Sequence, residues 1–288
     1  MFDYPAIYKE ADNISNKTQS NYLGILFIFL CMLFFSSLLF TYFNEIIVFK
    51  IVNIVIVFLI VILSFVFHFN NFQGKWYNAR AVAESIKTIS WRYAVKAEPY
   101  NVPDNDAKTS FIKAIKHIID MNHDFKECIE AEYSSSTQHN IPNNLTAVRL
   151  LSLQERINFY QINRVSEQKD WYTKKSLLNK KRSLQFFILL IFISFVLLIL
   201  LILSLIKTSN NILFPIESLL SMISILFTWV QTKKYKELEK SYALTAHEIG
   251  FIEIPCIDTD EKIFSDYVSN TENAFSREHT QWIAKKDS

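Results

Sequence analysis

Apolar positions along the chain gather into four blocks separated by polar or charged sequence. Two blocks lie close together, at about 22–43 and 46–69, and two more follow at about 184–206 and 212–229. Each is about 20 residues long, which is enough for a helix to cross a hydrocarbon core of ~30 Å. A buried helix of a soluble protein rarely stays apolar on every face over that length. The pattern therefore predicts four transmembrane helices arranged as two hairpins.

The sequence between and after these blocks predicts helices that continue beyond the membrane. Phe111, Ile115 and Ile118 recur at the spacing of one helix face. A long helix is expected to begin near Thr146 and to run unbroken into the third block, and the fourth block is expected to continue to about residue 252. The 288 residues include only 3 Gly and 6 Pro, and no segment alternates as a strand does. We predict an all-α membrane protein with four transmembrane helices, built as two two-span repeats whose helices extend into a cytoplasmic bundle.

A charged and aromatic pattern follows each hairpin at the same spacing. Trp76, Arg80 and Glu84 follow the first hairpin, and Trp229, Lys233 and Glu237 follow the second. Residues four apart in a helix lie on one face. The repetition predicts two related modules, 1–133 and 146–288, joined by a polar linker at 134–145, with the two patterns at equivalent positions on helices just inside the membrane.

Two interpretations of these six residues remain open from the sequence. They could form a coupling element that transmits a cytoplasmic signal to the spans. Alternatively, each tryptophan is an interfacial anchor, and each basic side chain extends toward the lipid headgroups. The charged residues would then form ion pairs four residues apart, each of which stabilises a helix by ~0.2–0.5 kcal/mol.

The distribution of positive charge predicts the orientation in the membrane, although the net charge is only +2. Lysines and arginines are concentrated in the sequence just before and just after the hairpins, and not in the short connections within them. They are Lys75, Arg80, Lys87, Arg92, Lys174, Lys175, Lys180, Lys181, Arg182, Lys233, Lys234 and Lys236. Such residues mark the cytoplasmic side. We expect both termini and the middle region, about 70–183, in the cytoplasm of a multi-pass inner-membrane protein. The first block has no basic leader and no small-residue cleavage site, so it should stay as an anchor.

Polar side chains within the fourth block suggest a water-lined path. The stripe consists of Glu217, Ser221, Ser224 and Thr228, which share one helix face. An acidic group at mid-membrane costs ~2.5–3.5 kcal/mol, so its presence invites a functional explanation. A cation-selective pore would use such a stripe. Small hydroxyl residues also pack membrane helices closely, and the glutamate could reach the headgroups or pair with a lysine, so packing remains the alternative.

Nothing in the sequence predicts an enzyme, a metal site or a cofactor. The cysteines Cys31, Cys128 and Cys256 are scattered, and the three glycines are too far apart to cradle a phosphate. A cluster of possible ligands at His117, Asp120, His123 and Asp124 does not converge on one side of its helix, which favours a solvated polar face. We expect no direct binding of nucleic acid.

Both halves of the chain resemble one family, the SLATT domains, which are two-span effector modules associated with SMODS and SLOG nucleotide-sensing partners in bacteria. The first half resembles one SLATT subtype through Tyr4–Tyr8, Ala11-Asp12, Trp76–Lys87, Trp91–Tyr93 and Ala97–Pro99. The second half resembles another subtype through Arg156, Tyr160, Arg164-Val165, Gln168, Trp171-Tyr172, Tyr235, Leu238, Ser241-Tyr242, Ala246, Glu272 and Glu278–Trp282. The resemblance covers nearly the whole chain except the polar linker.

The resemblance implies an oligomeric inner-membrane effector of a bacterial conflict system, such as antiphage defence by abortive infection. Such an effector would form a pore or perturb the membrane when triggered from the cytoplasm. No sensor domain is fused to the modules, so a separate cytoplasmic activator is expected, together with the bilayer and further copies of the chain as partners. The alternative is a membrane-anchored scaffold that recruits a cytoplasmic partner without conducting ions.

Overall fold

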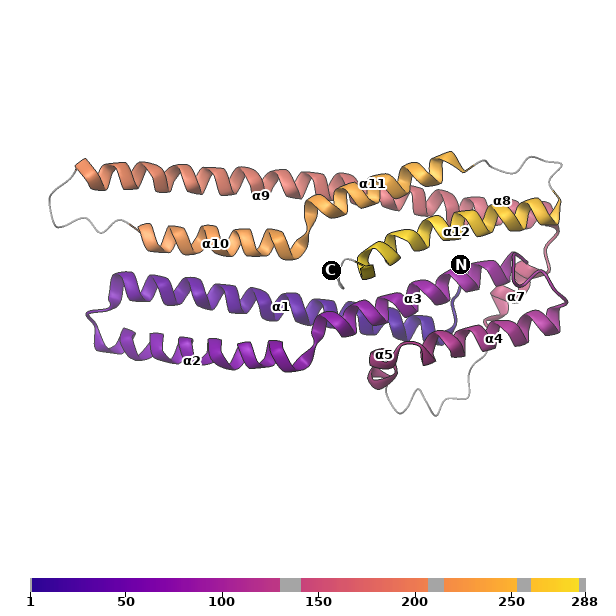
Figure 1. The fold of residues 1–288 in the computed structure, drawn as a ribbon, viewed down its shortest axis with the longest axis horizontal. Helices are drawn as coiled ribbons and strands as arrows, with labels where there is room; N and C mark the ends of the chain where they lie inside the picture. Colours follow the sequence, from indigo (N-terminus) through magenta and orange to yellow (C-terminus); the bar gives the residue numbers. More distant parts are fainter. Residues whose placement is uncertain (1, 130–140, 207–214, 253–259, 285–288) are drawn as a thin grey trace. The chain divides into compact units, whose positions relative to one another are not determined.

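The structure is a computed structural model that describes residues 2–129, 141–206, 215–252 and 260–284 (Figure 1). Its helices are α1 (Ala6–Phe43), α2 (Ile47–Asn70), α3 (Phe72–Ala94), α4 (Asp104–Asp120), α5 (His123–Cys128), α7 (Asn143–Arg149), α8 (Leu153–Tyr160), the π-helix η1 (Gln161–Ser166), α9 (Glu167–Ile206), α10 (Ile216–Lys233), α11 (Tyr235–Phe251) and α12 (Glu261–Ala284). No strand occurs in these ranges. The all-α prediction is therefore confirmed, while most of the predicted linker at 134–145 lies outside the described residues.

Three helical stretches are long and apolar enough to cross a membrane: Ala6–Phe43, Ile47–Ala94 and Leu153–Leu205. Their apolar side chains are exposed over much of each surface, for example Ile54 at 69% and Phe192 at 63%. Soluble proteins rarely expose apolar area on this scale, so the apolar parts of these helices, which lie in residues 20–71 and 176–205, belong in lipid. The predicted fourth span, about 212–229, lies partly outside the described residues, and its remainder falls in the 18-residue α10, which continues to Lys233. The count of four spans thus stays a prediction.

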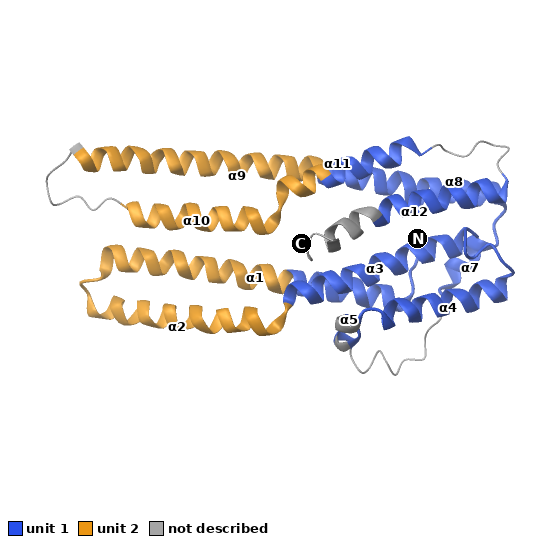
Figure 2. Ribbon diagram, viewed as in Figure 1, with its two compact units in different colours: residues 1–19, 72–175, 241–288 blue, residues 20–71, 176–240 orange. Residues whose placement is uncertain are grey.

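The chain divides into two compact units (Figure 2). Unit 1 comprises residues 1–19, 72–175 and 241–288, and unit 2 comprises 20–71 and 176–240. Helices α1 and α9 pass from one unit into the other without interruption. Each unit takes helices from both halves of the sequence, so the halves share one core outside the apolar hairpins.

Two helices predicted to be continuous are interrupted, and each break has a local cause. The helix expected from Thr146 ends at Arg149, and a new one starts after Ser152. The Glu155 carboxylate accepts the backbone N–H of Ser152 at 2.9 Å, which is half of a capping box and favours a helix start. The helix expected through residues 229–252 breaks at Lys234, which has a left-handed φ of 49°.

Unit 1 has a closed core of aromatic and aliphatic side chains around α3. Trp91 of α3 contacts the rings of Tyr160 and Phe2, and Tyr93 of α3 stacks on Phe111 of α4 at 4.7 Å between centroids. Phe111 is fully buried, as the helical stripe in the sequence predicted. Helices α4, α5, α7 and α12 all pack on α3. Helix α3 is therefore the axis on which unit 1 assembles.

Unit 2 contains the two apolar hairpins. Helices α1 and α2 form the first, joined through ring contacts of Tyr22 and Phe29 with Phe67. Helices α9 and α10 form the second (Figure 1). The segment that joins α9 to α10 is not among the described residues. A ring contact between Phe27 of α1 and Trp229 of α10 connects the two hairpins.

Candidate coupling site

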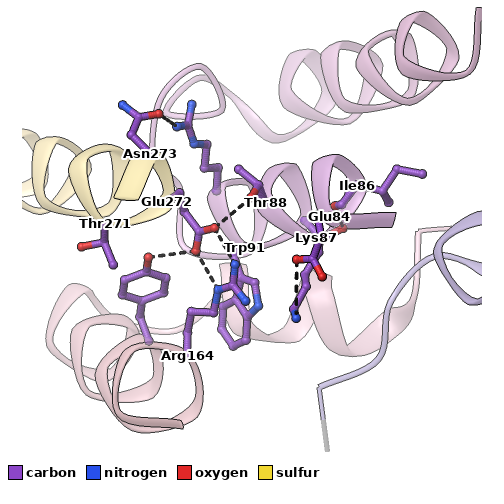
Figure 3. A network of polar contacts seen from close by, with 12 residues as sticks. Glu84, Ile86, Lys87, Thr88, Trp91, Arg164, Thr271, Glu272 and Asn273 are labelled. Atoms are coloured by element: carbon purple, nitrogen blue, oxygen red, sulfur yellow. Dashed lines mark hydrogen bonds and ion pairs between the residues drawn. The ribbon is translucent and has the colours of Figure 1, made fainter. Parts of the chain in front are cut away.

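The centre of unit 1 holds an ion pair that is almost completely buried. Arg164 of η1 has 2% of its side chain exposed, and Glu272 of α12 has none. The pair is bidentate: Arg164 Nε donates to Glu272 Oε1 at 2.9 Å, and Arg164 Nη2 donates to Oε2 at 2.7 Å (Figure 3). Two parallel charge-assisted bonds fix both distance and orientation. The pair therefore locks α12 onto η1 in one register.

Two hydroxyl groups complete the surroundings of the Glu272 carboxylate. Tyr160 of α8 donates to Oε1 at 2.9 Å, and Thr88 of α3 donates to Oε2 at 3.1 Å. The carboxylate thus accepts four hydrogen bonds from α3, α8 and η1 (Figure 3). A buried charge is tolerated only when it is paired and its remaining lone pairs are occupied. Each of these three elements is required for the carboxylate to be satisfied.

Protonation in this cluster favours the same hydrogen-bond pattern. Burial by itself lowers the pKa of Arg164, but the neighbouring Glu272 carboxylate outweighs burial and holds that pKa above its ordinary value. Burial, reinforced by the negative charge of Glu272, raises the pKa of Tyr160 well above its ordinary value. Arg164 therefore stays charged and Tyr160 stays protonated, and both keep donating to the carboxylate.

Trp91 connects this ion pair to the segment that begins the chain. The Arg164 guanidinium carbon lies 6.0 Å from the Trp91 ring centroid and 4.5 Å from that of Phe275. Trp91 Nε1 donates to the Tyr4 hydroxyl at 2.9 Å, and the Phe2 ring stacks on Trp91 at 3.8 Å with 3° between the planes. Residues just before α1, together with α3, η1 and α12, thus meet at one point.

Two further buried arginines from the second half of the chain hold the end of α3. Arg149 donates to the carbonyls of Tyr93 and Val102 at 2.9 and 2.8 Å and pairs with Asp104 at 2.7 Å. Arg156 donates to the carbonyl of Val95 at 2.7 Å. The last carbonyls of a helix have no partner within the helix and carry partial negative charge, so cations are favoured there.

Arg156 also bonds to the Glu261 carboxylate at the start of α12. Besides the bond from Thr88 to Glu272, α3 and α12 share the bond from Arg92 to the Asn273 side chain at 2.9 Å. Helix α12 is therefore attached near its first turn as well as at Glu272.

The first predicted pattern lies on α3 in unit 1, and its charges are paired. Arg80 binds Glu84 at 2.9 Å and lies 3.7 Å from Asp12, while Lys87 lies 3.8 Å from Glu84. The ring of Trp76 stacks on Tyr77 at 4.6 Å. Burial lowers the pKa of Lys87, partly offset by Glu84. Of these pairs, Arg80–Glu84 is four residues apart, and the choice between a coupling element and an interfacial anchor stays a prediction.

The second predicted pattern is divided by the break at Lys234, so the expectation of one continuous helix face was wrong. Trp229 and Lys233 lie on α10, with Lys233 Nζ 5.1 Å from the Trp229 ring centroid, whereas Glu237 lies on α11. Trp76 follows the helix break at Asn71 and lies in unit 1, whereas Trp229 precedes the helix break at Lys234 and lies in unit 2. The two tryptophans therefore do not occupy equivalent positions relative to the breaks.

The polar stripe of the fourth block lies on α10. Glu217 accepts a hydrogen bond from Thr41 of α1 at 2.9 Å. The hydroxyls of Ser221, Ser224 and Thr228 donate to carbonyls of their own helix at 2.9, 3.0 and 2.8 Å. Glu217, Ser224 and Thr228 are exposed in the single chain, and Ser221 is half-buried. That this stripe lines a water-filled path stays a prediction.

Within the described residues, no group of three or more His, Cys, Asp and Glu side chains is placed to hold a metal ion. His117 and Asp120 lie on α4, and the side chains of His123 and Asp124 are not described. The sequence did not single out the Arg164–Glu272 pair as a site. Its members are 108 residues apart, and the only signal was their presence among residues that carried the family resemblance.

Comparison with known proteins identifies two domains in tandem. The family model of the SMODS and SLOG-associating 2TM effector domain 3 matches residues 5–157, and that of the SMODS and SLOG-associating 2TM effector domain 1 matches residues 160–282. The boundary between the two matches falls within α8. Neither the curated proteins nor the solved structures compared with the chain gave a match.

Proposed function

Because the chain belongs to the SMODS and SLOG-associating two-transmembrane effector (SLATT) family, we propose that it is an inner-membrane effector of a bacterial conflict system whose membrane action is triggered from the cytoplasm. In this proposal both termini and unit 1 are cytoplasmic, in line with the lysines and arginines at the flanks of the hairpins. The chain acts without enzymatic chemistry of its own, and a separate cytoplasmic protein or nucleotide supplies the trigger.

The observation that carries this proposal is the convergence of membrane-entering helices on Glu272 and Trp91. Helix α3 continues from the α2 span, η1 leads into α9, and residues 2–5 lead into α1. Contacts at Thr88, Arg164 and Tyr4 tie these three paths together. A ligand that moved α12 would change the contacts of Thr88 and Arg164 directly and that of Tyr4 only through Trp91, and packed elements with discrete arrangements transmit a signal in this way.

The membrane action proposed is a pore formed by several copies. Side chains fill a single four-helix bundle, so one chain leaves no channel for water. The stripe at Glu217, Ser221, Ser224 and Thr228 on α10 would face the central path, because an acid and hydroxyls are costly against lipid but suit water. Glu217 gives such a path a negative charge, which favours cations.

The test is ion leakage from liposomes and depolarisation of cells that express the protein. Glu217→Leu and Ser221→Leu should each reduce leakage and toxicity, with membrane insertion and protein amount unchanged. Ser64→Leu is the matched control, because Ser64 on α2 also donates to a carbonyl of its own helix, at 2.9 Å. This control should leave leakage unaltered.

Two outcomes would remove the pore assignment. If Glu217→Leu and Ser221→Leu leak as much as the parent, the stripe does not line a path. If the parent never depolarises a membrane, the second candidate function takes its place, a non-conducting scaffold that recruits a cytoplasmic partner. The scaffold is favoured by one observation: the hydroxyls of Ser221, Ser224 and Thr228 already have partners on their own helix and do not need water.

A further inference from the structure

The basic residues that flank the two hairpins differ in how their charge is balanced. At the first hairpin, Arg80 lies against Asp12 and Glu84, and Lys87 also lies near Glu84. Arg80 and Lys87 are therefore paired within the chain. The second hairpin carries Arg182 on α9 and Lys233 on α10.

The geometry of the second hairpin brings Arg182 and Lys233 to one place. Helices α9 and α11 are held together by the bond from Ser176 Oγ to the Glu239 carbonyl at 2.9 Å, and Phe186 of α9 stacks on Tyr235 at 5.5 Å. Arg182 lies one turn before Phe186 and so on the same face of α9. Lys233 lies two residues before Tyr235, and burial, reinforced by the positive charge of Arg182, lowers the pKa of Lys233.

Neither Arg182 nor Lys233 forms an ion pair with a carboxylate in the described part of the chain. Further exposed cations lie nearby in sequence on the same helices, at Lys180, Lys181, Lys236 and Lys240. Two cations held together without a counter-charge are unfavourable unless an anion lies between them. The site is therefore charged to receive an anion.

We propose that Arg182 and Lys233 bind the phosphate of an acidic phospholipid from the bilayer leaflet at the basic end of the second hairpin. Arg182 offers a planar set of donors that fits a phosphate, and Lys233 offers a mobile ammonium group. At the first hairpin, by contrast, Arg80 and Lys87 are already paired with Glu84.

The surroundings of the pair select a lipid over a free phosphate. Directly after Arg182, α9 exposes Leu184 and Phe187 at 58% and 59%, and this apolar surface suits acyl chains. Trp229 lies beside Lys233 and places an aromatic ring where headgroups meet hydrocarbon. An anion that brings its own apolar tail therefore gains contacts that inorganic phosphate lacks.

The test counts phospholipids retained by the full chain purified in a mild detergent, by native mass spectrometry after addition of phosphatidylglycerol or phosphatidylcholine. The parent should retain phosphatidylglycerol in preference to phosphatidylcholine. Arg182→Gln with Lys233→Gln should reduce retention of phosphatidylglycerol about thirtyfold, as expected for removal of two interfacial cations. The exchange Arg182→Lys with Lys233→Arg keeps both charges and should retain the lipid.

Two controls separate this site from general charge. Lys108→Gln with Lys113→Gln removes two exposed cations of α4, and Arg80→Gln removes a paired cation of the first hairpin; both should retain phosphatidylglycerol like the parent. The proposal is overturned if the Arg182/Lys233 variant retains as much lipid as the parent while still folded by circular dichroism. It is also overturned if phosphatidylcholine is retained equally, or if millimolar inorganic phosphate displaces the lipid.

Discussion

Unit 1 and unit 2 consist of the same kind of secondary structure but are stabilised in opposite ways. Unit 1 encloses large aromatic side chains such as Trp91 and Phe264, which are 1% exposed. In unit 2, α2 has no buried residue at all, and apolar side chains such as Phe58, at 64%, face outward. Lipid is as apolar as these side chains, so it solvates them and removes the hydrophobic drive for the helices to pack on each other.

The difference gives a carboxylate in each unit a different role. Glu272 in unit 1 is completely buried and accepts four hydrogen bonds. Glu217 in unit 2 is exposed and accepts one bond from Thr41, whose hydroxyl is also 2.9 Å from the Ser37 carbonyl. One hydroxyl proton can serve only one acceptor at a time. Mutations at similar residues should therefore have unequal effects in the two units.

The largest contrast is expected between Glu272→Leu and Glu217→Gln. The first leaves the charge of Arg164 buried without its partner and should lower the free energy of unfolding by about 3–5 kcal/mol. The second removes one exposed bond and should cost less than about 1 kcal/mol. Denaturant unfolding of the detergent-solubilised chain, followed by near-ultraviolet circular dichroism, measures both.

A double variant checks the physical reason for the Glu272 effect. Replacing both partners, as Arg164→Met with Glu272→Leu, should destabilise less than Glu272→Leu alone, because no buried charge remains. If the double variant is the less stable of the two, the stabilising contribution comes from packing at these positions and not from compensation of charge.

A second contrast sets a buried arginine against an exposed one. Arg149→Met deprives the carbonyl of Tyr93, in a buried bond, and that of Val102, in a partly buried one, of their donor and should destabilise by about 2–3 kcal/mol. Arg80→Met breaks an ion pair whose arginine is 38% exposed and should cost less than about 1 kcal/mol. Equal losses in the same unfolding measurement would contradict the assignment of Arg149 as the cap of α3.

The apolar blocks and the capping box could be read from the sequence because their signals are local. About 20 apolar residues in succession mark a span without reference to the rest of the chain, and the order Ser152-x-x-Glu155 marks a helix start, although we expected a continuous helix there. Asn71 is a residue type that adopts left-handed φ with little strain, and it ends α2.

The remaining features depend on contacts that the sequence does not encode locally. Lys234 has no propensity for its left-handed conformation, so the break that separates Lys233 from Glu237 could not be anticipated. The sequence contains 28 acidic residues, and Arg164 pairs with Glu272 because the packing of η1, α3 and α12 places that carboxylate beside it. The repeated spacing of Trp76 and Trp229 indicated equivalent positions, but the location of each break decided where the residues lie.

Alkaline pH should weaken unit 1 through its buried tyrosines. Burial, partly offset by Arg92, raises the pKa of Tyr100 to about 12 from an ordinary value near ~10. The folded state then binds more protons than the unfolded state between these values. Stability is fully present below pH ~10, falls as pH rises, and levels off above pH ~12, with a loss from this group of at most about 2–3 kcal/mol.

Tyr100→Phe isolates that contribution. The variant should match the parent in stability near pH 8 and exceed it progressively from pH ~10 to ~12, because its ring cannot ionise. Denaturant unfolding at a series of pH values measures the difference. A constant difference across this range would show that Tyr100 ionises equally in the folded and unfolded states.

The smallest contrast concerns the two helix breaks. Glycine adopts left-handed φ without the strain that a Cβ causes, whereas asparagine is already tolerant of it. Lys234→Gly should therefore stabilise the chain by about 0.5–1 kcal/mol, and Asn71→Gly should change stability by less than this. Lys240→Gly lies in the interior of α11 at an exposed position and should destabilise by about 1 kcal/mol, which makes it the control for the general cost of glycine in a helix. Unfolding of the three variants ranks them directly. If Lys234→Gly destabilises as much as Lys240→Gly, the chain does not break at Lys234, and Lys233 and Glu237 share the continuous helix face that the repeated pattern suggested.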